Sequence, residues 1–450
     1  MKLDASKSID LRSLVPEIPS TGYVTHSFDS YPSKMIPHMA RFLIQQISKP
    51  GQTILDPLCG SGSTLIEASL TGRNATGIDI NPLATLLAKA KTNTYDISVL
   101  KHQLPEILRL LKNSKLGCTY EFPNCNFWFT PATLRKLGIV KSVLAEYLPA
   151  NDSLYALFWQ ALLSMIVRQC SRADTRGPKP FISKKARQKR KGKHFDPFKL
   201  FGKKACQWIS AVEEYQSELK RVGRVPTIEV TRGDARMLSG LITRQVDAIV
   251  TSPPYLNAQD YYRSSKLQLF ILGQFSPSYL RDWSRSVIGS DRLLASMPLL
   301  EMRLPNADAE AIKERIAQCS PKKACVFAKY IVDMTLVLSE ISKVLIKDGK
   351  CAVVLGNNFV EQIPIPTAEL VAQLASQTGL DLKSTYKNRV RDRHVPVTRN
   401  GHSGVVEEEY LMIFQRTNSQ VGSAGFVASL DTFGPQPLPG KQPLSTSAAR

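Results

Sequence analysis

Residues 53–64 read TILDPLCGSGST, a short apolar run that ends in an acid and leads into a turn rich in glycine and serine. Helical spacing continues from Thr64 to about Leu70, and Ala75–Ile80 forms a second strand-like run that contains Asp79. A strand, a turn, a helix and another strand are typical of a mostly parallel sheet with helices on both faces. We therefore expect an α/β fold whose ligand lies where the first strand ends.

The rest of the chain divides around this unit. Further strands are predicted at Thr227–Thr231, Val246–Thr251, Cys351–Leu355 and Met412–Gln415. Helices are predicted at 37–47, 82–92, 99–112, 132–147, 153–170, 203–221 and 327–346. The pattern predicts an irregular segment at 1–25, an α/β domain made of 26–94 and 226–416, and a helical and basic insertion at 95–225. A second insertion covers 256–325, and the Ser-, Gly-, Pro- and Gln-rich tail at 417–450 is expected to be disordered.

The charge of the chain favours a polyanionic partner. Lys and Arg number 59 against 38 Asp and Glu, which gives a net charge of +21. Residues 172–204 hold 13 Lys or Arg and two Asp, about half of the whole excess. Basic side chains near phosphates release condensed counterions, so we expect this stretch to be a loop that contacts a nucleic-acid backbone. A solvated charge run is the alternative.

Several classes of protein are disfavoured. The eight cysteines form no C-x-x-C pair and lie beside no suitably spaced histidine, so we expect a reduced cytosolic chain without a metal site. The first residues, MKLDASKSIDLRSLVPEI, lack the apolar region of a secretory signal. The apolar stretch Leu154–Val167 is too short to span a membrane and is expected to be a buried helix.

Acids follow three successive strands. Asp56 precedes the turn in which Gly60 and Gly62 allow a close approach of the backbone to a ligand. Asp79 stands at the usual spacing for an acid that accepts hydrogen bonds from ribose hydroxyls, and Asp234 would receive an adenine amine. Each acid alone is more often a helix cap. Together they favour a bound nucleoside, and the turn lacks the lysine of a P-loop, which argues against an NTPase.

The segment VDAIVTSPPY, residues 246–255, carries the strongest chemical signal. An apolar strand runs into two prolines, which have no N–H donors but keep their carbonyl acceptors. The Ser252 hydroxyl and the Pro253 carbonyl would bind the two hydrogens of an exocyclic base amine and favour the pyramidal nitrogen that attacks a sulfonium methyl group. Tyr255 would stack on a flipped base. A turn that only ends a strand is the alternative.

The combination of DPLCGSGS, GIDINP and TSPPY resembles the amino-methyltransferases of DNA, and the TSPPY variant resembles their cytosine-N4 group. FDSYPSKMIP, residues 28–37, is similar to the motif that precedes the Gly-rich turn in this family, so the motif order is unpermuted. The resemblance implies a doubly wound, mostly parallel, seven-stranded Rossmann-like sheet and the cofactor S-adenosyl-L-methionine. The departures are Leu58, where the family usually has an aromatic residue, Ser63-Thr64 in place of two threonines, and an insertion of about 130 residues after the second strand.

The site residues that the resemblance implies fall into two groups. Those around the cofactor are Phe28, Tyr31, Pro32, Lys34, Asp56, Pro57, Gly60, Ser61, Gly62, Asp79, Ile80, Asn81, Asp234 and Ala235. Those that hold the target base are Ser252, Pro253, Pro254 and Tyr255. No metal is expected to take part.

Basic residues in three places are expected to contact DNA. They are Lys184, Lys185, Arg187, Lys189, Arg190, Lys191, Arg263, Lys266, Arg389 and Arg391. The last two belong to a basic, polar segment, 386–400, that is expected to be a loop, and a surface hairpin without function is the alternative. Phosphate contacts do not specify sequence, so the insertion at 256–325 is a candidate for reading base edges.

The implied function is site-specific transfer of a methyl group to the N4 amine of cytosine in double-stranded DNA, in the cytoplasm of a prokaryote and in association with its nucleoid. It implies a restriction–modification system whose cognate endonuclease need not touch this chain. Methylation of carbon 5 would need a Pro-Cys nucleophile, and the sequence has no such dipeptide. The alternatives are adenine N6, for which Asp or Asn usually replaces Ser252, a guanine-N2 RNA methyltransferase, and an inactive DNA-binding subunit. The recognition sequence and the oligomeric state stay open.

Overall fold

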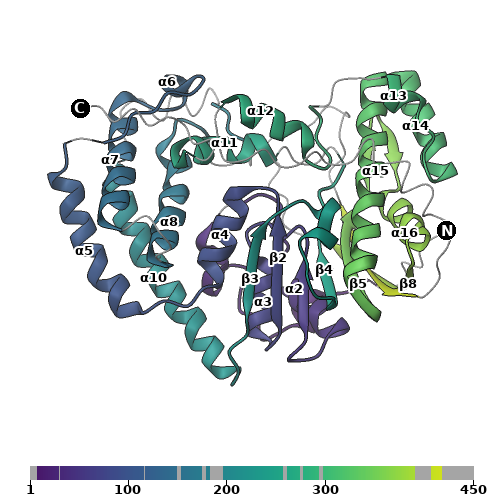
Figure 1. The fold of residues 1–450 in the computed structure, drawn as a ribbon, viewed down its shortest axis with the longest axis horizontal. Coiled ribbons are helices and arrows are strands. Elements are labelled where there is room, and N and C mark those ends of the chain that lie inside the picture. Colours follow the sequence, from purple (N-terminus) through teal and green to yellow (C-terminus); the bar gives the residue numbers. More distant parts are fainter. Residues whose placement is uncertain are drawn as a thin grey trace.

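The computed structural model describes residues 8–29, 31–115, 117–148, 154–174, 179–182, 196–256, 261–273, 277–292, 297–390 and 407–417. Within these residues the centre of the fold is a seven-stranded sheet with the order β3-β2-β1-β4-β5-β9-β8 (Figure 1). Its strands are β1 (Thr53–Asp56), β2 (Asn74–Asp79), β3 (Ile228–Arg232), β4 (Val246–Thr251), β5 (Leu345–Gly356), β8 (Leu380–Arg389) and β9 (Glu408–Arg416). A separate hairpin consists of β6 (Asn358–Val360) and β7 (Ile363–Ile365).

Strand direction decides which residues meet at one edge of the sheet. β1, β2, β3, β4 and β5 are parallel, whereas β9 runs antiparallel to both β5 and β8. The order reverses between β1 and β4, and ligands bind at such a switch point outside the carboxyl ends of the strands. The expected doubly wound, mostly parallel sheet is confirmed. Because β9 is reversed, its first residues lie at the same edge as the last residues of β4 and β5.

Alternation of apolar side chains covers both faces of the sheet. Ile54 and Val250 pack on the face that carries α2, while Leu55 and Ile249 pack on the face that carries α15. The helices of the two faces are α2 (Pro37–Ile47), α3 (Ser63–Leu70), α4 (Pro82–Thr92), α15 (Pro321–Val344) and α16 (Thr367–Gln377). The strands are therefore buried on both sides, as a parallel sheet requires.

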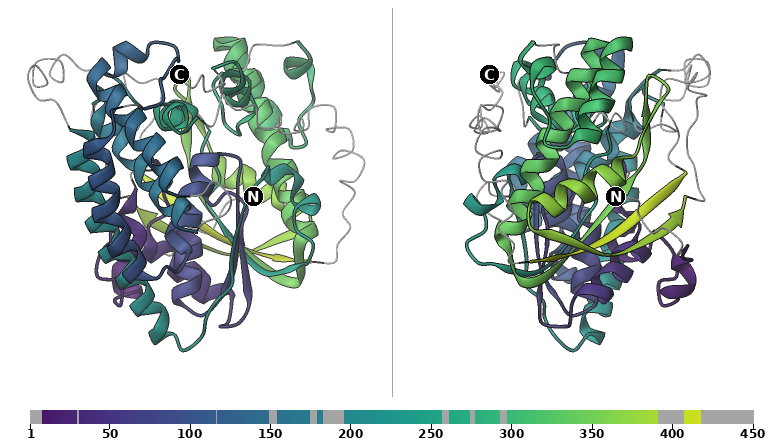
Figure 2. Two further views of the ribbon diagram at one scale, coloured as in Figure 1. Left: turned by 60° about the vertical axis from the view of Figure 1, so that its left-hand side comes forward. Right: turned by 90° about the vertical axis from the view of Figure 1, so that its right-hand side faces the viewer.

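The first insertion forms a layer of helices beside the sheet. Its helices are α5 (Ile97–Asn113), α6 (Cys125–Trp128), α7 (Pro131–Tyr147), α8 (Leu154–Cys170) and α10 (Pro197–Arg221). Figures 1 and 2 show them (blue to teal) together at one side of the sheet, away from the green helices of the C-terminal half. Trp159 and Trp208 lie in one apolar cluster with Leu83 and Leu87 of α4, so the insertion shares a core with the α/β domain. The expectation that Leu154–Val167 forms a buried helix is confirmed.

The second insertion lies across the edge where the strands end. It contains α11 (Tyr261–Leu272), α12 (Pro277–Ser286), α13 (Met297–Glu301) and α14 (Ala307–Cys319). In Figure 1, α11 and α12 lie above the strands, and α13 and α14 lie against α15. This insertion therefore covers the edge of the sheet at which the parallel strands end.

Two segments differ from expectation. The N-terminal part, expected to be irregular, contains α1 (Leu11–Leu14) and the 3-10 helix η1 (Val24–Phe28), because Leu11 and Val15 pack on the α2 cluster. The expected basic loop begins instead within β8, so its described part is a strand. Tyr386 of this edge strand packs edge-on against Phe42. Most of the other residues of β8 are polar and only partly buried. The tail from 418 onward lies outside the described residues.

Candidate active site

A cavity of about 850 Å³ lies at the carboxyl ends of β1, β2 and β4 and beside η2 (Ala235–Gly240), which follows β3. Its walls come from the turns after these strands, from residues 31–35 and from α11 and α12. The lining residues are Tyr31, Pro32, Ser33, Lys34, Met35, Asp56, Leu58, Cys59, Gly60, Ser61, Ser63, Thr64, Asp79, Ile80, Asn81, Asp234, Ala235, Arg236, Ser252, Pro254, Tyr261, Trp283, Ser286, Val287 and Ile288.

The Gly-rich turn forms one wall of this cavity. Gly60 and Gly62 have φ angles of 51° and 87°, in the left-handed region that favours glycine. Gly60 lines the cavity, as expected, whereas Gly62 does not. A Cβ on Gly62 would lie 3.1 Å from the Cβ of Ala88, so this glycine serves the start of α3 and its packing on α4. Pro57, also expected at the cofactor, lies outside the lining.

Asp56 joins the ends of β1 and β4. Its carboxylate accepts hydrogen bonds from the Thr251 hydroxyl at 2.8 Å and from the Leu58 N–H at 3.1 Å. Burial raises the pKa of Asp56 to about 6. Because Thr251 immediately precedes Ser252, this contact fixes the start of the TSPPY turn against the Gly-rich turn.

Asp79 holds the turns after β1 and β2 together. It accepts the Gly60 N–H at 2.9 Å on one oxygen and the Asn81 N–H at 2.8 Å on the other. Burial raises the pKa of Asp79 to about 6. Each oxygen keeps a lone pair, so the carboxylate is able to accept further hydrogen bonds from hydroxyl donors inside the cavity.

Asp234 at the end of β3 is bound by Arg236, which the sequence interpretation missed. The guanidinium donates from Nε and Nη2 to the two oxygens of Asp234, at 3.0 and 2.6 Å. It also binds Asp333 of α15 at 2.7 Å, and Lys329 binds the same Asp333 carboxylate at 2.7 Å. Asp234 thus caps η2 and also lines the cavity, and its contact with an adenine amine stays a prediction. The pattern RGDAR carried the signal, since its second arginine can fold back onto the acid.

The TSPPY turn stands between two cavities. Pro254 lines the first cavity, while Pro253 and Tyr255 line a second one of about 580 Å³. Ser252 lines both, and its hydroxyl donates to the Val354 carbonyl of β5 at 3.3 Å. A ligand in either cavity would therefore be in reach of the same side chain. The other residues of the second cavity are Ser33, Lys34, Met35, Ile36, Met39, Tyr261, Val354 and Glu409.

Glu409, the second residue of β9, also escaped the sequence interpretation. It accepts a hydrogen bond from the Tyr255 hydroxyl at 3.1 Å, and burial raises its pKa. Burial and the nearby Glu409 also raise the pKa of Tyr255. The late strand was predicted at Met412–Gln415, four residues after its true start, and its reversed direction was not considered. If the last strand had been predicted to be antiparallel, its N-terminal residues would have been expected at the edge of the sheet where the site lies.

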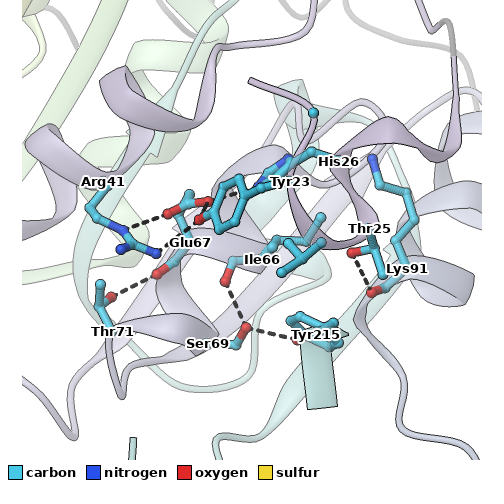
Figure 3. A network of polar contacts seen from close by, with 12 residues as sticks. Tyr23, Thr25, His26, Arg41, Ile66, Glu67, Ser69, Thr71, Lys91 and Tyr215 are labelled. Atoms are coloured by element: carbon cyan, nitrogen blue, oxygen red, sulfur yellow. Dashed lines mark hydrogen bonds and ion pairs between the residues drawn. The ribbon is translucent and has the colours of Figure 1, made fainter. Parts of the chain in front are cut away.

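A buried ion network holds the chain that leads to residues 31–36, which contribute to the walls of both cavities (Figure 3). Glu67 of α3 accepts hydrogen bonds from Arg41 Nε at 2.7 Å, from the Tyr23 hydroxyl at 2.5 Å and from His26 Nε2 at 2.7 Å. Burial lowers the pKa of His26, so its ring is neutral at pH 7 and donates its N–H to the carboxylate. The network ties the chain that leads to residues 31–36 to α2 and α3.

A second ion pair continues this support towards the cavity. Asp29 binds Lys91 at 2.8 Å and Lys34 at 3.4 Å, and Lys91 holds its pKa at about 2 despite burial. Tyr31, Pro32 and Lys34 line the cavity as expected. Phe28 does not: it is buried and stacks on Trp208 at 3.8 Å, so its part is to dock the insertion.

The residues expected to contact DNA are only partly described. Lys184, Lys185, Arg187, Lys189, Arg190, Lys191 and Arg391 lie outside the described residues. Arg263 is exposed on α11, the helix whose Tyr261 lines both cavities. The Lys266 ammonium lies 4.6 Å from the ring centre of Trp128, and Arg389 is exposed at the end of β8. Contact of these side chains with DNA stays a prediction.

Other expectations concern metals, membranes and cysteines. Among the described residues there is no group of three or more His, Cys, Asp or Glu side chains suited to a metal ion. The part of the chain that the structure covers contains no helix with the length and apolarity needed to cross a bilayer. All eight cysteines are free thiols in the structure.

Known proteins with similar sequences are methyltransferases. Residues 14–90 match a family model described as DNA methylase. The type II methyltransferase M.MvaI of Kocuria varians is 25% identical over 423 residues, which cover 88% of this chain and 92% of that protein. The type II methyltransferase M.MjaII of Methanocaldococcus jannaschii is 37% identical over 111 residues, 25% of this chain and 20% of that one. A tRNA (guanine(10)-N2)-dimethyltransferase of Methanothermobacter thermautotrophicus is 46% identical over 52 residues, 11% of this chain and 16% of that one.

Proposed function

We propose that this chain is a DNA amino-methyltransferase that methylates the N4 amine of cytosine at specific sites in double-stranded DNA. The observation that carries the proposal is the position of Ser252, which lines both cavities of the site. The first cavity would hold the methyl donor and the second the target base. A transfer between two bound groups needs them in contact, and Ser252 lies where the two cavities adjoin.

The first cavity fits S-adenosylmethionine. Asp79 offers carboxylate acceptors for ribose hydroxyls, and Trp283 and Ile288 offer apolar faces for an adenine ring. Asp234 is fixed by Arg236 but keeps lone pairs for an adenine amine. When bound, this cofactor supplies an electrophilic methyl group on a positively charged sulfur.

In the second cavity the protein's own groups would orient the base. The Ser252 hydroxyl and the Pro253 carbonyl accept hydrogens from the target amine, and Tyr255 offers a ring for stacking. Acceptors around the nitrogen favour its pyramidal form, in which the lone pair is available. The choice of cytosine over adenine rests on serine at position 252, because Asp or Asn is usual there in adenine-N6 relatives.

The base must leave the helix to enter this cavity, so duplex DNA would lie over the edge covered by α11 and α12. The net charge of +21 supplies the attraction to its phosphates. By analogy with its type II relatives, we place the chain in a prokaryotic restriction–modification system, acting in the cytoplasm beside an endonuclease of the same specificity.

A guanine-N2 RNA methyltransferase is the second candidate, favoured by the short match to the tRNA enzyme. Incubation with radiolabelled S-adenosylmethionine and equal amounts of plasmid DNA and total tRNA separates the two. We expect label in the DNA. Label confined to the tRNA would reject the proposed substrate.

Protonation of Asp79 should weaken cofactor binding below about pH 6, because its raised pKa means that the carboxylate is lost there. An acid that accepts hydroxyl hydrogens binds best when charged, so affinity for S-adenosylmethionine should fall as the pH drops from 7 to 5. Asp79→Asn should lower affinity at pH 7 roughly tenfold or more, since hydrogen bonds to charged groups contribute about 1.5–3 kcal/mol. Calorimetric titration across this range checks both. A pH dependence that survives in Asp79→Asn would assign it to another group, with Asp56 the first candidate.

Charge reversal of Lys189, Arg190 and Lys191 to glutamate should weaken binding to duplex DNA and flatten its salt dependence. The slope of log K against log salt should fall by about 0.9 for each phosphate that the variant no longer neutralises. Fluorescence anisotropy over a salt series measures it. The matched control reverses Arg224, Arg244 and Lys347, exposed residues near the opposite edge of the sheet. Equal effects of the two triple variants would show that net charge alone matters.

A further inference from the structure

The half-buried acid Glu409 has no assigned role, and the direction of its strand places it at the site. In β9 it pairs with Gly356, the last residue of β5, and with Asn388 of β8. β9 is antiparallel to β5, so the start of β9 lies beside the carboxyl ends of β5 and β4. The Glu409 side chain lines the second cavity together with Ser252 and Tyr255.

The contacts of Glu409 leave it without a compensating cation among the described residues. One carboxylate oxygen accepts from the Tyr255 hydroxyl at 3.1 Å and the other from Asn388 Nδ2 at 3.3 Å. The neighbouring Glu408 differs, since it is exposed and pairs with Lys387 at 3.1 Å. A half-buried carboxylate held only by neutral donors remains able to accept a hydrogen from a ligand in the cavity.

The titratable groups around this cavity are Tyr255 of the TSPPY turn, Tyr261 of α11 and Lys34 of the N-terminal segment. The Lys34 ammonium is directed to Asp29 and to the carbonyls of His26 and Asp29. Burial raises the pKa of Glu409, while the hydrogen bonds from Tyr255 and Asn388 oppose the shift. A carboxylate with a raised pKa is a stronger base than an exposed glutamate.

We propose that Glu409 accepts the proton that the target amine must lose during methylation. The inference rests on the proposed function, because it takes the second cavity as the site of the base. The role is that of a general base acting on the substrate nitrogen, beside the hydrogen-bond acceptors Ser252 and Pro253.

The step balances with groups already named. The amine nitrogen uses its lone pair to form the bond to the methyl carbon, and the carbon–sulfur bond breaks with its electron pair left on sulfur. The nitrogen then carries a positive charge and one hydrogen too many. Its N–H bond breaks, the pair stays on nitrogen, and the proton passes to the Glu409 carboxylate and from there to solvent. No oxidant, metal or further co-reactant is required.

The test is the pH profile of single-turnover methyl transfer in Glu409→Gln, with saturating labelled S-adenosylmethionine and a mixture of unmodified plasmid and phage DNA. In the native protein the rate should rise with pH through the raised pKa of Glu409. In Glu409→Gln it should be lower by on the order of 100-fold, the usual contribution of a general base, and this acidic limb should vanish. Saturating cofactor keeps protonation of Asp79 from limiting the rate.

Three controls separate catalysis from structure. Glu408→Gln changes the same side chain one residue earlier and should keep the native profile. Tyr255→Phe removes the hydrogen bond that stabilises the carboxylate, so it should move the acidic limb to higher pH, whatever its effect on the maximum rate. Cofactor affinity and the thermal unfolding midpoint of Glu409→Gln should match the native protein, since glutamine still accepts from Tyr255.

The experiment tests the role of Glu409 separately from the identity of the substrate. A Glu409→Gln protein that keeps a native rate and an unchanged acidic limb overturns the inference, even if the native protein makes N4-methylcytosine. If the native protein instead methylates adenine or RNA, the proposed target fails, yet loss of the limb in Glu409→Gln on that substrate would still support the general base.

Discussion

Replacing Ser252 with alanine should lower the rate of methyl transfer by on the order of 10²–10³-fold, the usual loss when one preorganised polar contact is removed from a site. Ser252 is one of the side chains that line both cavities, and its hydroxyl donates to the Val354 carbonyl. In the proposed reaction its loss removes an acceptor from the target amine, while Asp79 and the other residues that line the first cavity are unchanged. Affinity for S-adenosylmethionine should therefore stay close to the native value.

Single-turnover rates with labelled cofactor, together with calorimetric titration of the cofactor, measure the two quantities separately. Ser239→Ala is a matched control, because this serine hydroxyl binds Glu340 away from both cavities. Its rate should be native. Native methylation by Ser252→Ala would remove Ser252 from the catalytic turn and with it the assignment of the second cavity.

Replacing Glu67 with glutamine should destabilise the fold by about 3–5 kcal/mol, the usual cost of breaking a buried ion pair. Glu67 is fully buried, and its charge compensates Arg41 while it accepts from Tyr23 and His26 (Figure 3). The variant removes the buried partner of the guanidinium and leaves it only the partly exposed Glu17, at 3.7 Å. Because the network holds the chain before residues 31–36, cofactor affinity should fall as well.

The shift of the urea unfolding midpoint measures this effect. Glu106→Gln is the control, since Glu106 pairs with Arg109 on the exposed face of α5 and such surface pairs contribute at most about 1 kcal/mol. An unfolding midpoint of Glu67→Gln that equals that of Glu106→Gln would show that the network is dispensable.

The sheet was predictable from the sequence because its central strands are short apolar runs between clear turn signals. β1 and β4 begin and end at the predicted residues, Thr53–Asp56 and Val246–Thr251. Both are buried on two faces, so composition alone marks them. The edge strand β8 was missed because one of its faces is partly exposed and carries polar residues. Only Tyr386, which packs on Phe42, signals that this segment is packed on the core.

The site was predictable where backbone geometry and sequence agree. Asp56, Gly60 and Asp79 lie at strand ends and line the cavity. Phe28 and Gly62 were expected at the cofactor by resemblance; neither lines the cavity and both make packing contacts, which a motif does not distinguish from binding. No local sequence pattern predicts contacts between segments that are far apart in the sequence.

Glu409 and Arg236 are the two clearest examples of such contacts. Glu409 meets Tyr255 across 154 positions of sequence, and Arg236 meets Asp333 across 97. The order and direction of the strands bring Glu409 to Tyr255, and the packing of η2 on α15 brings Arg236 to Asp333. The helical insertion was predicted from its periodicity, whereas the core that it shares with α4 depended on tertiary packing.

The most direct test of the proposed function is the identity of the methylated nucleoside. Plasmid DNA is incubated with the protein and labelled S-adenosylmethionine, digested to nucleosides, and analysed by mass spectrometry against standards. We expect N4-methyldeoxycytidine in the native reaction and none with Ser252→Ala. N6-methyldeoxyadenosine, or the absence of any methylated nucleoside, would contradict the assignment of cytosine N4 as the target.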